Sequence, residues 1–341
     1  MNRSTEPLVS VVTPVYNGAD FFVECIDSIL TQTYQNFEYI IVNNCSTDRT
    51  LEIALDYAKR DRRIQVHTNS EFVGVMENHN IALNLISPQA KYCKVVCADD
   101  FIFAECLAKM VELAENNPSV TMVGSYSLAG KKVMHSGLEY ERRIVNGREI
   151  CRATLLGGPY VFGSPTTLLY RADVVRKTKC FFPGSSPHSD TAACYKWLED
   201  SDFGFVHQVL SYTRIHAGSE TSRSIKVGTL HLSKVDDVAR FGPRYLDRVE
   251  LKCRLAQTTT EYYRALVPSL FVQLRNREFW QRQSDALQEI GLRFSRVKLI
   301  KALVVKALRL LLDPRKVVRK ILVMSGRVET TEAQYYDQAI S

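Results

Sequence analysis

Short runs of apolar, often β-branched residues alternate with amphipathic stretches along the first third of the chain. Between the runs, apolar residues recur at helical spacing, as at Phe22, Ile26 and Ile29. Repeated alternation of strand and helix predicts an α/β fold, a mostly parallel sheet flanked by helices on both faces. Ligands bind such sheets beyond the carboxyl ends of the strands. The runs that predict strands lie at residues 8–13, 37–42, 64–67, 92–97 and 120–123.

The pattern changes twice farther along. Between residues 125 and 224 the periodicity is weaker and turn residues such as Gly157, Gly163 and Pro165 are frequent. After a Ser/Thr-rich stretch, long helical patterns take over. We therefore expect one domain over residues 1–224, with halves 1–124 and 125–224, followed by a helical region over residues 225–341.

The charge of the chain is concentrated near its C-terminus. The 341 residues are 45% hydrophobic and 24% charged, which is typical of a folded protein, and the formal net charge is +7. Residues 293–327 alone carry +10, so the others together carry −3, and we expect no nucleic-acid partner. In that segment the cations interleave with Leu, Ile and Val. This basic amphipathic pattern favours an anionic membrane surface, with packing on the rest of the protein or on a second subunit as the alternative.

Cysteine usage and hydropathy indicate where the protein works. The nine Cys residues are odd in number, scattered and without a C-x-x-C pair, which argues against a disulfide framework or a zinc ribbon. No leader precedes an apolar stretch at the N-terminus, and no apolar run approaches the ~18 residues that span a bilayer. We expect a cytoplasmic protein, peripheral at the inner face of the cell membrane if the basic segment binds lipid.

Polar motifs follow three of the predicted strands. The first loop reads Thr13-Pro14-Val15-Tyr16-Asn17-Gly18, the second Asn43-Asn44-Cys45-Ser46-Thr47-Asp48, and the fourth strand is followed by Asp99-Asp100. Each motif alone is typical of a turn or a helix cap. Their joint position at the carboxyl edge of one parallel sheet instead predicts a shared crevice.

In this combination the chain resembles the family 2 glycosyltransferases, which have the GT-A fold, over residues 8–222. The resemblance implies an inverting, metal-dependent transfer of a sugar from a nucleotide diphosphate sugar, UDP-sugar favoured, to an acceptor hydroxyl. It also implies a saccharide or lipid-linked acceptor and a role in assembling bacterial surface polysaccharide or glycolipid. Its motifs are the three loops, the segment 28–34, Gly74 with His79-Asn80, and Ser189-Asp190.

The resemblance implies a site for Mg²⁺ or Mn²⁺. Asp100 would coordinate the ion, Asp99 would share the metal or bind the ribose, and His216 would ligate the metal or a phosphate. Arg214 would neutralise phosphate charge. Cys97 stands where relatives often have another Asp, and because a thiol is a poor ligand for Mg²⁺, diphosphate oxygens and water would complete the shell.

The remaining implied roles concern the donor and the proton transfer. Asp190 would be the base that deprotonates the acceptor hydroxyl, with an N-cap of the following helix as the alternative. Asn44 stands where the family has an Asp that accepts from the uracil imide, and its amide oxygen can also accept. The resemblance implies that five further residues bind the nucleotide sugar; the alternative is that they close turns and pack helices. These residues are Thr13, Pro14, Tyr16, His79 and Asn80.

Two other functions stay open. A sugar nucleotidyltransferase also uses a parallel sheet and metal-binding carboxylates, but it should carry a Gly-rich basic phosphate loop after the first strand, which residues 13–18 lack. A catalytically inactive nucleotide-sugar-binding scaffold is suggested by Cys97, Asn43, Asn44 and Ser189, which stand where acids are usual. The presence of Asp99, Asp100 and Asp190 together argues against that loss of activity.

Overall fold

The computed structural model describes residues 6–184, 188–216, 218–219 and 229–312. The chain divides into two compact units, Met1–Arg214 and Ile215–Ser341. The predicted boundary near residue 225 lies outside the described residues, as do residues 313–327 of the basic segment.

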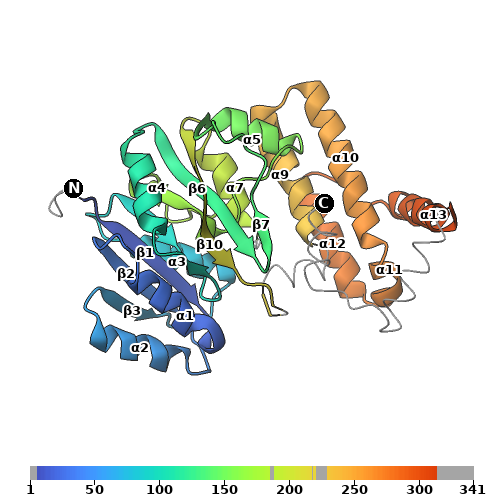
Figure 1. The fold of residues 1–341 in the computed structure, drawn as a ribbon. Coiled ribbons are helices and arrows are strands. Elements are labelled where there is room, and N and C mark those ends of the chain that lie inside the picture. The colour runs from blue at the N-terminus through green and yellow to red at the C-terminus, as the bar shows by residue number, and fades with distance from the viewer. Residues whose placement is uncertain (1–5, 185–187, 217, 220–228, 313–341) are drawn as a thin grey trace. The chain divides into compact units, whose positions relative to one another are not determined.

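The first unit is built on one mixed sheet covered by helices (Figure 1). Its strand order is β3-β2-β1-β4-β9-β6-β10-β5, with β7 paired to β6 and β8 paired to β10. The strands are β1 (Val9–Val15), β2 (Phe37–Asn43), β3 (Ile64–Thr68), β4 (Tyr92–Val95), β5 (Phe101–Ile102), β6 (Val120–Ala129), β7 (Lys132–Met134), β8 (Ile144–Asn146), β9 (Leu169–Arg171) and β10 (Asp202–Thr213).

Six of these strands run in one direction. Strands β3, β2, β1 and β4 pair in parallel, and so do β6 and β10. Strand β9 is antiparallel to both β4 and β6, so these two also run the same way. The carboxyl ends of β1, β2, β4, β6 and β10 therefore face one edge of the sheet, which confirms the predicted arrangement.

Helices cover the sheet because each presents an apolar stripe to it. Helix α1 buries Phe22, Ile26 and Ile29 in a core that also holds Val11 and Tyr39 from the sheet. The elements of this unit outside the sheet are α1 (Ala19–Leu30), α2 (Thr50–Arg60), α3 (Val75–Asn84), α4 (Cys106–Glu115), α5 (Gly147–Leu155), the 3-10 turn η2 (Pro165–Thr167), α6 (Ala172–Val175) and α7 (Ser189–Trp197).

All five predicted strands differ in their boundaries from the observed ones; the first, for example, continues to Val15. The strand predicted over 92–97 ends at Val95, because the chain turns there and the Asp100 amide donates to the Cys97 carbonyl at 3.0 Å. The strand predicted over 120–123 continues to Ala129, because β10 pairs with it along its whole length. Strand β10 itself was not predicted.

The second unit is helical, as predicted. Its helices are α9 (Thr229–Tyr245), α10 (Arg248–Leu266), α11 (Ser269–Val272), α12 (Arg277–Glu289) and α13 (Arg296–Leu312). A small core holds them together, in which Tyr262 donates to Gln283 at 2.9 Å and Tyr263 accepts from the Ser295 amide at 2.7 Å. None of the described helices is long and apolar enough to cross a membrane.

Candidate active site

The site is centred on Asp100, at the carboxyl edge of the sheet. Its carboxylate accepts a hydrogen bond from the Thr166 hydroxyl at 2.6 Å and another from the Arg214 backbone amide at 2.9 Å. Three separate segments therefore meet here: the loop after β4, the turn η2, and the end of β10. Burial and the neighbouring charge of Asp99 raise the pKa of Asp100 to about 8.

A buried lysine lies beneath this carboxylate. Lys94, on β4, is fully buried, and its ammonium donates to the carbonyls of Thr166 at 2.5 Å and Leu168 at 3.1 Å. Burial lowers its pKa. These bonds fix the turn η2, and the Thr166 hydroxyl in that turn holds Asp100. Sequence reasoning missed both residues, although a lysine within the apolar run of β4 was a visible signal.

Arg214 contacts both acidic residues of the pair through its backbone and side chain. Its guanidinium donates to the Asp99 carbonyl at 2.9 Å, forms an ion pair with Glu24, and lies over the ring of Phe21 at 4.5 Å. Arg214 thus lies at the acidic pair, and its contact with a phosphate stays a prediction. His216 lies in the second unit, and its role at the metal stays a prediction.

The acidic pair suits a hard cation that takes part of its shell from a ligand. Asp99 and Asp100 offer carboxylate oxygens, and in the described residues no cluster of three His, Cys, Asp or Glu side chains is placed to enclose a metal. Mg²⁺ and Mn²⁺ fit such a site, because Mg²⁺ usually binds one or two carboxylates, substrate phosphates and water. Burial raises the pKa of the Cys97 thiol, which disfavours the thiolate form that binds metals.

The first two loops are tied together by their own motif residues. Asn17, in the left-handed backbone region at φ 49°, accepts from the Thr47 amide at 2.8 Å, and Asp48 accepts from the Ala19 amide at 3.1 Å. Thr13 is fully buried and accepts from Tyr39 at 3.0 Å, and Pro14 is buried beside it. The side chains of Thr13 and Pro14 are therefore buried in the fold, and their contact with a ligand stays a prediction.

Asn44 is committed to the loop that follows β3. Its amide oxygen accepts from Asn69 and from the Val73 amide, both at 3.0 Å, and its amide nitrogen donates to the Val73 carbonyl at 2.8 Å. Both lone pairs of the oxygen are used in this structure, so a bond from the uracil imide would have to replace one of these partners, and that role of Asn44 stays a prediction. This clamp positions Phe72, which is 60% exposed and contacts the exposed Tyr16 edge-on with 4.7 Å between ring centroids.

His79 and Asn80 brace helix α3. The His79 ring nitrogen Nδ1 lies 2.8 Å from the Val75 carbonyl, and burial lowers its pKa. The side-chain amide of Asn80 both donates to the Phe182 carbonyl at 3.0 Å and accepts from the Phe182 amide at 2.9 Å. The packing alternative therefore describes Asn80, and a contact of either residue with a diphosphate stays a prediction.

Asp190 lies in the first turn of α7. The helix begins at Ser189, one residue before it, so the N-cap alternative is wrong; His188 holds the cap position without a capping side chain. Asp190 accepts from the Thr191 amide at 2.8 Å, and burial raises its pKa to about 6. The Thr191 hydroxyl lies 2.7 Å from that of Tyr160, which links α7 to the loop over residues 156–164, between α5 and η2.

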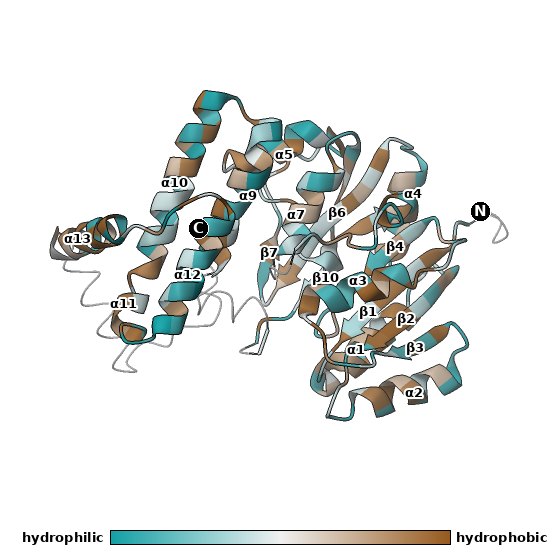
Figure 2. Ribbon diagram, turned by 180° about the vertical axis from the view of Figure 1, so that it is seen from behind, coloured by the Kyte–Doolittle hydropathy of each residue, from teal (hydrophilic) through white to brown (hydrophobic). Residues whose placement is uncertain are grey.

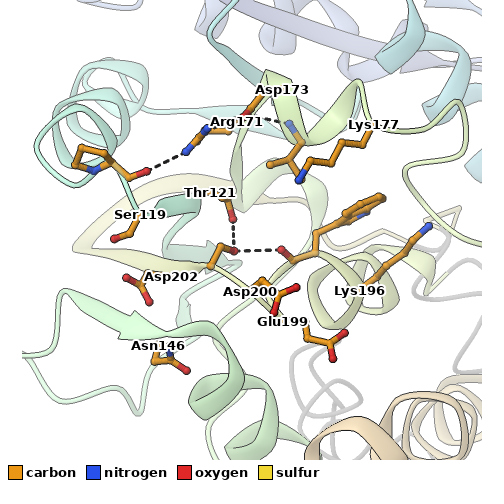
Figure 3. A pocket seen from close by; sticks show the side chains of 14 residues that line it. Ser119, Thr121, Asn146, Arg171, Asp173, Lys177, Lys196, Glu199, Asp200 and Asp202 are labelled. Atoms are coloured by element: carbon orange, nitrogen blue, oxygen red, sulfur yellow. Dashed lines mark hydrogen bonds and ion pairs between the residues drawn. The ribbon is translucent and has the colours of Figure 1, made fainter.

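A polar pocket of about 540 Å³ lies at the opposite edge of the sheet (Figure 3). Thr121 and Asp202, at the starts of β6 and β10, line it. Charged residues of both signs line it, and two of them, Arg171 and Asp173, form an ion pair at 2.5 Å. None of the residues that the sequence singled out lines this pocket, so this pocket is not the candidate site.

Known proteins share both the sequence pattern and the fold. The family model "Glycosyl transferase family 2" matches residues 10–178. An uncharacterized glycosyltransferase of Haemophilus influenzae is 33% identical, covering 63% of this chain and 68% of that protein. Glycosyltransferase GlyG of Streptococcus pneumoniae is 30% identical, covering 76% of this chain and 89% of GlyG.

Solved structures match at lower identity. TarS 1-349 of S. aureus in complex with UDP-GlcNAc has a TM-score of 0.61 and 18% identity, covering 86% of this chain and 89% of that one. The mannosyltransferase PcManGT from Pyrobaculum calidifontis in complex with GDP-Man and Mn²⁺ has a TM-score of 0.57 and 16% identity, covering 99% of this chain and 87% of that one. With these sequence and structural matches, and with the acidic pair at the carboxyl edge of a GT-A-like sheet, the chain belongs to glycosyltransferase family 2 and is a glycosyltransferase.

Proposed function

We propose that the enzyme transfers a sugar from a nucleotide diphosphate sugar, preferably a UDP-sugar, to an acceptor hydroxyl with inversion at the anomeric carbon. The observation that carries this proposal is the convergence of Thr166 and the Arg214 amide on the buried carboxylate of Asp100. Donors seen in similar folds, UDP-GlcNAc in TarS and GDP-Man with Mn²⁺ in PcManGT, support it.

Asp100 and Asp99 would hold the divalent cation. When bound, the cation supplies positive charge that stabilises the diphosphate as it leaves. The two hydrogen bonds to Asp100 fix the carboxylate so that one orientation faces the ligand. Arg214 would add a second positive group once its guanidinium exchanges Glu24 for a phosphate oxygen.

Asp190 would accept the proton of the acceptor hydroxyl as that oxygen attacks the anomeric carbon. Its pKa of about 6 leaves the carboxylate ionised at neutral pH while keeping it more basic than an exposed Asp. The neighbouring loop, joined through Tyr160 and Thr191, would shape the acceptor side of the site.

The nucleobase would stack on Tyr16 and Phe72. Both rings are substantially exposed at the carboxyl edge, and Asn44 holds the loop that carries Phe72. Because the Asn44 oxygen is saturated, selectivity for the base would rest on stacking and on backbone atoms near Thr13. We therefore expect weaker discrimination of UDP from other nucleoside diphosphates than an ionised acid at position 44 would give.

The acceptor would be a saccharide or a lipid-linked saccharide, in the assembly of surface polysaccharide or glycolipid. A cytoplasmic location fits the nine cysteines, all of which are free thiols. Such a compartment also supplies sugar nucleotides.

Calorimetric titration tests the proposal. UDP, dTDP and GDP would be titrated into the protein with Mn²⁺ and with EDTA, using Asp100→Ala and, as a matched control, Asp56→Ala on the exposed face of α2. We expect metal-dependent binding of UDP that is lost in Asp100→Ala and retained in Asp56→Ala. Absence of binding to all three nucleotides by folded protein would refute the proposal and favour a scaffold that has lost its ligand.

A further inference from the structure

Helix α13 has apolar residues on two opposite sides. The inner side packs in the second unit: Leu299 and Ala302 are buried in the cluster that holds Tyr263 and Leu266 of α10. The inner side therefore holds α13 against the rest of the second unit. The apolar residues on the outer side take no part in this packing, so they need another explanation.

The outer side is an exposed apolar stripe. Its members recur every three or four residues and so lie on one face of the helix. Between about half and four-fifths of each side chain is exposed, whereas an ordinary surface helix carries polar residues there. In Figure 2 the visible turns of α13 carry brown apolar and teal polar residues. The outer stripe consists of Val297, Ile300, Val304, Leu308 and Leu312.

The charges around the outer stripe are of one sign. Residues 293–312 contain six Lys or Arg and no Asp or Glu. Four of the cationic side chains are exposed, namely Arg293, Arg296, Lys298 and Lys301. An apolar stripe bordered by cations is the pattern of a helix that lies in the interface of an anionic membrane.

We propose that the outer stripe of α13 docks on an anionic lipid bilayer, with its apolar side chains below the headgroups and the flanking cations among them. Charge complementarity selects this occupant. A second copy of residues 293–312 would bring the same six positive charges, and residues 313–327 of the chain carry five further cations against one acid. Nucleic acid matches the charge but offers no apolar partner to the stripe.

The proposal concerns the second unit alone and does not rest on the proposed sugar transfer. Its test is co-sedimentation of the full-length protein with vesicles of phosphatidylcholine alone and with vesicles that also contain phosphatidylglycerol. The stripe variant is Val304→Asp, and its control is Val249→Asp at an equally apolar, 72% exposed position of α10. The charge variant is Lys301→Gln, with Lys252→Gln on α10 as its control.

We expect binding to the phosphatidylglycerol vesicles only, weakened by added salt. Val304→Asp should abolish it and Lys301→Gln should weaken it about fivefold, since one surface cation contributes about that factor, while both controls bind like the wild type. Circular dichroism would show that each variant keeps its helices. The proposal is overturned by equal binding to both vesicle types, by equal binding of Val304→Asp and Val249→Asp, or by self-association through the stripe without vesicle binding.

Discussion

Replacing Thr166 with Val should weaken metal-dependent nucleotide binding and lower stability, because a single hydroxyl serves two buried partners. It donates to Asp100 at 2.6 Å and accepts from the Cys97 amide at 3.0 Å. Val has nearly the same shape, so the change removes the hydrogen bonds and leaves no cavity.

The stability cost follows from the two partners left behind. An unsatisfied buried amide costs about 1–3 kcal/mol, and loss of the hydrogen bond to the Asp100 carboxyl, which is mostly neutral at pH 7 because its pKa is about 8, costs about 0.5–1.5 kcal/mol. We expect the free energy of unfolding to fall by about 2–4 kcal/mol, a large part of the ~5–15 kcal/mol typical of a domain. Urea unfolding of the isolated variant measures it.

The effect on the ligand is separate from the effect on stability. Loss of a group that orients a metal ligand lowers metal affinity about 10- to 100-fold. The pKa of Asp100 predicts the same direction of change in metal affinity. The Thr166 hydrogen bond lowers that pKa, so its loss raises the pKa and leaves less carboxylate at neutral pH. Calorimetry of UDP with Mn²⁺ should show this loss, and Thr166→Ser, which keeps the hydroxyl, should restore binding.

The neighbouring Thr167 provides the control. It is buried in the same turn, but its hydroxyl donates to the carbonyls of Phe162 and Ser164, each at 2.7 Å. Thr167→Val should cost about 1 kcal/mol of stability and leave metal affinity unchanged. If Thr166→Val and Thr167→Val bind Mn²⁺ and UDP equally well, Thr166 does not hold Asp100 in its working orientation.

Three further predictions address other parts of the first unit. Asp190→Asn should retain donor binding and abolish transfer. In the wild type, kcat/KM at saturating Mn²⁺ should fall as the pH drops below about 6, because Asp190 becomes protonated there and can no longer act as the base. A kcat/KM that does not change with pH in this range would exclude that role. Asn44→Asp should lower stability by about 1–3 kcal/mol in urea and weaken UDP binding, since a carboxylate oxygen would face the Val73 carbonyl 2.8 Å away; tighter UDP binding would show that the clamp opens. Gly147→Ala should cost about 3 kcal/mol or more, because its Cβ would lie 2.0 Å from the Leu198 carbonyl, whereas Gly74→Ala, with nothing within 4 Å, should stay within about 1 kcal/mol of the wild type by thermal melting.

The sequence was most informative where local chemistry decides the structure. Strands such as β2 are buried on both faces, so their apolar runs are visible in the sequence, and the acidic pair follows such a run. Strand β10 was hidden because polar residues such as His207 and Gln208 interrupt it, and its length is set by pairing with β6. The local sequence pattern does not show which distant strand a segment will pair with.

In the candidate site, too, some features could be predicted from the sequence and others depend on tertiary contacts. The position of Asp100 could be read from its motif, but its support could not: Thr166 lies 66 residues away, in the turn before β9, and the antiparallel pairing of β9 with β4 brings that turn near. Asn44 was correctly placed after β2, yet its hydrogen-bonding capacity depends on Asn69 and Val73, which only the folded loop brings near. Composition identifies which groups are present, and tertiary contacts decide which of them are already used.

The last strand of the sheet also determines when the site can exist. Strand β10 lies between β6 and β5, and the amide that follows it, from Arg214, is the second donor to Asp100, 114 residues earlier. A chain leaving the ribosome therefore cannot complete the site until residue 214 has emerged, and until then β6 presents an open edge to its surroundings. A fragment that stops at residue 178, where the family match ends, would keep the acidic motif and lack the strand and the donor that complete it.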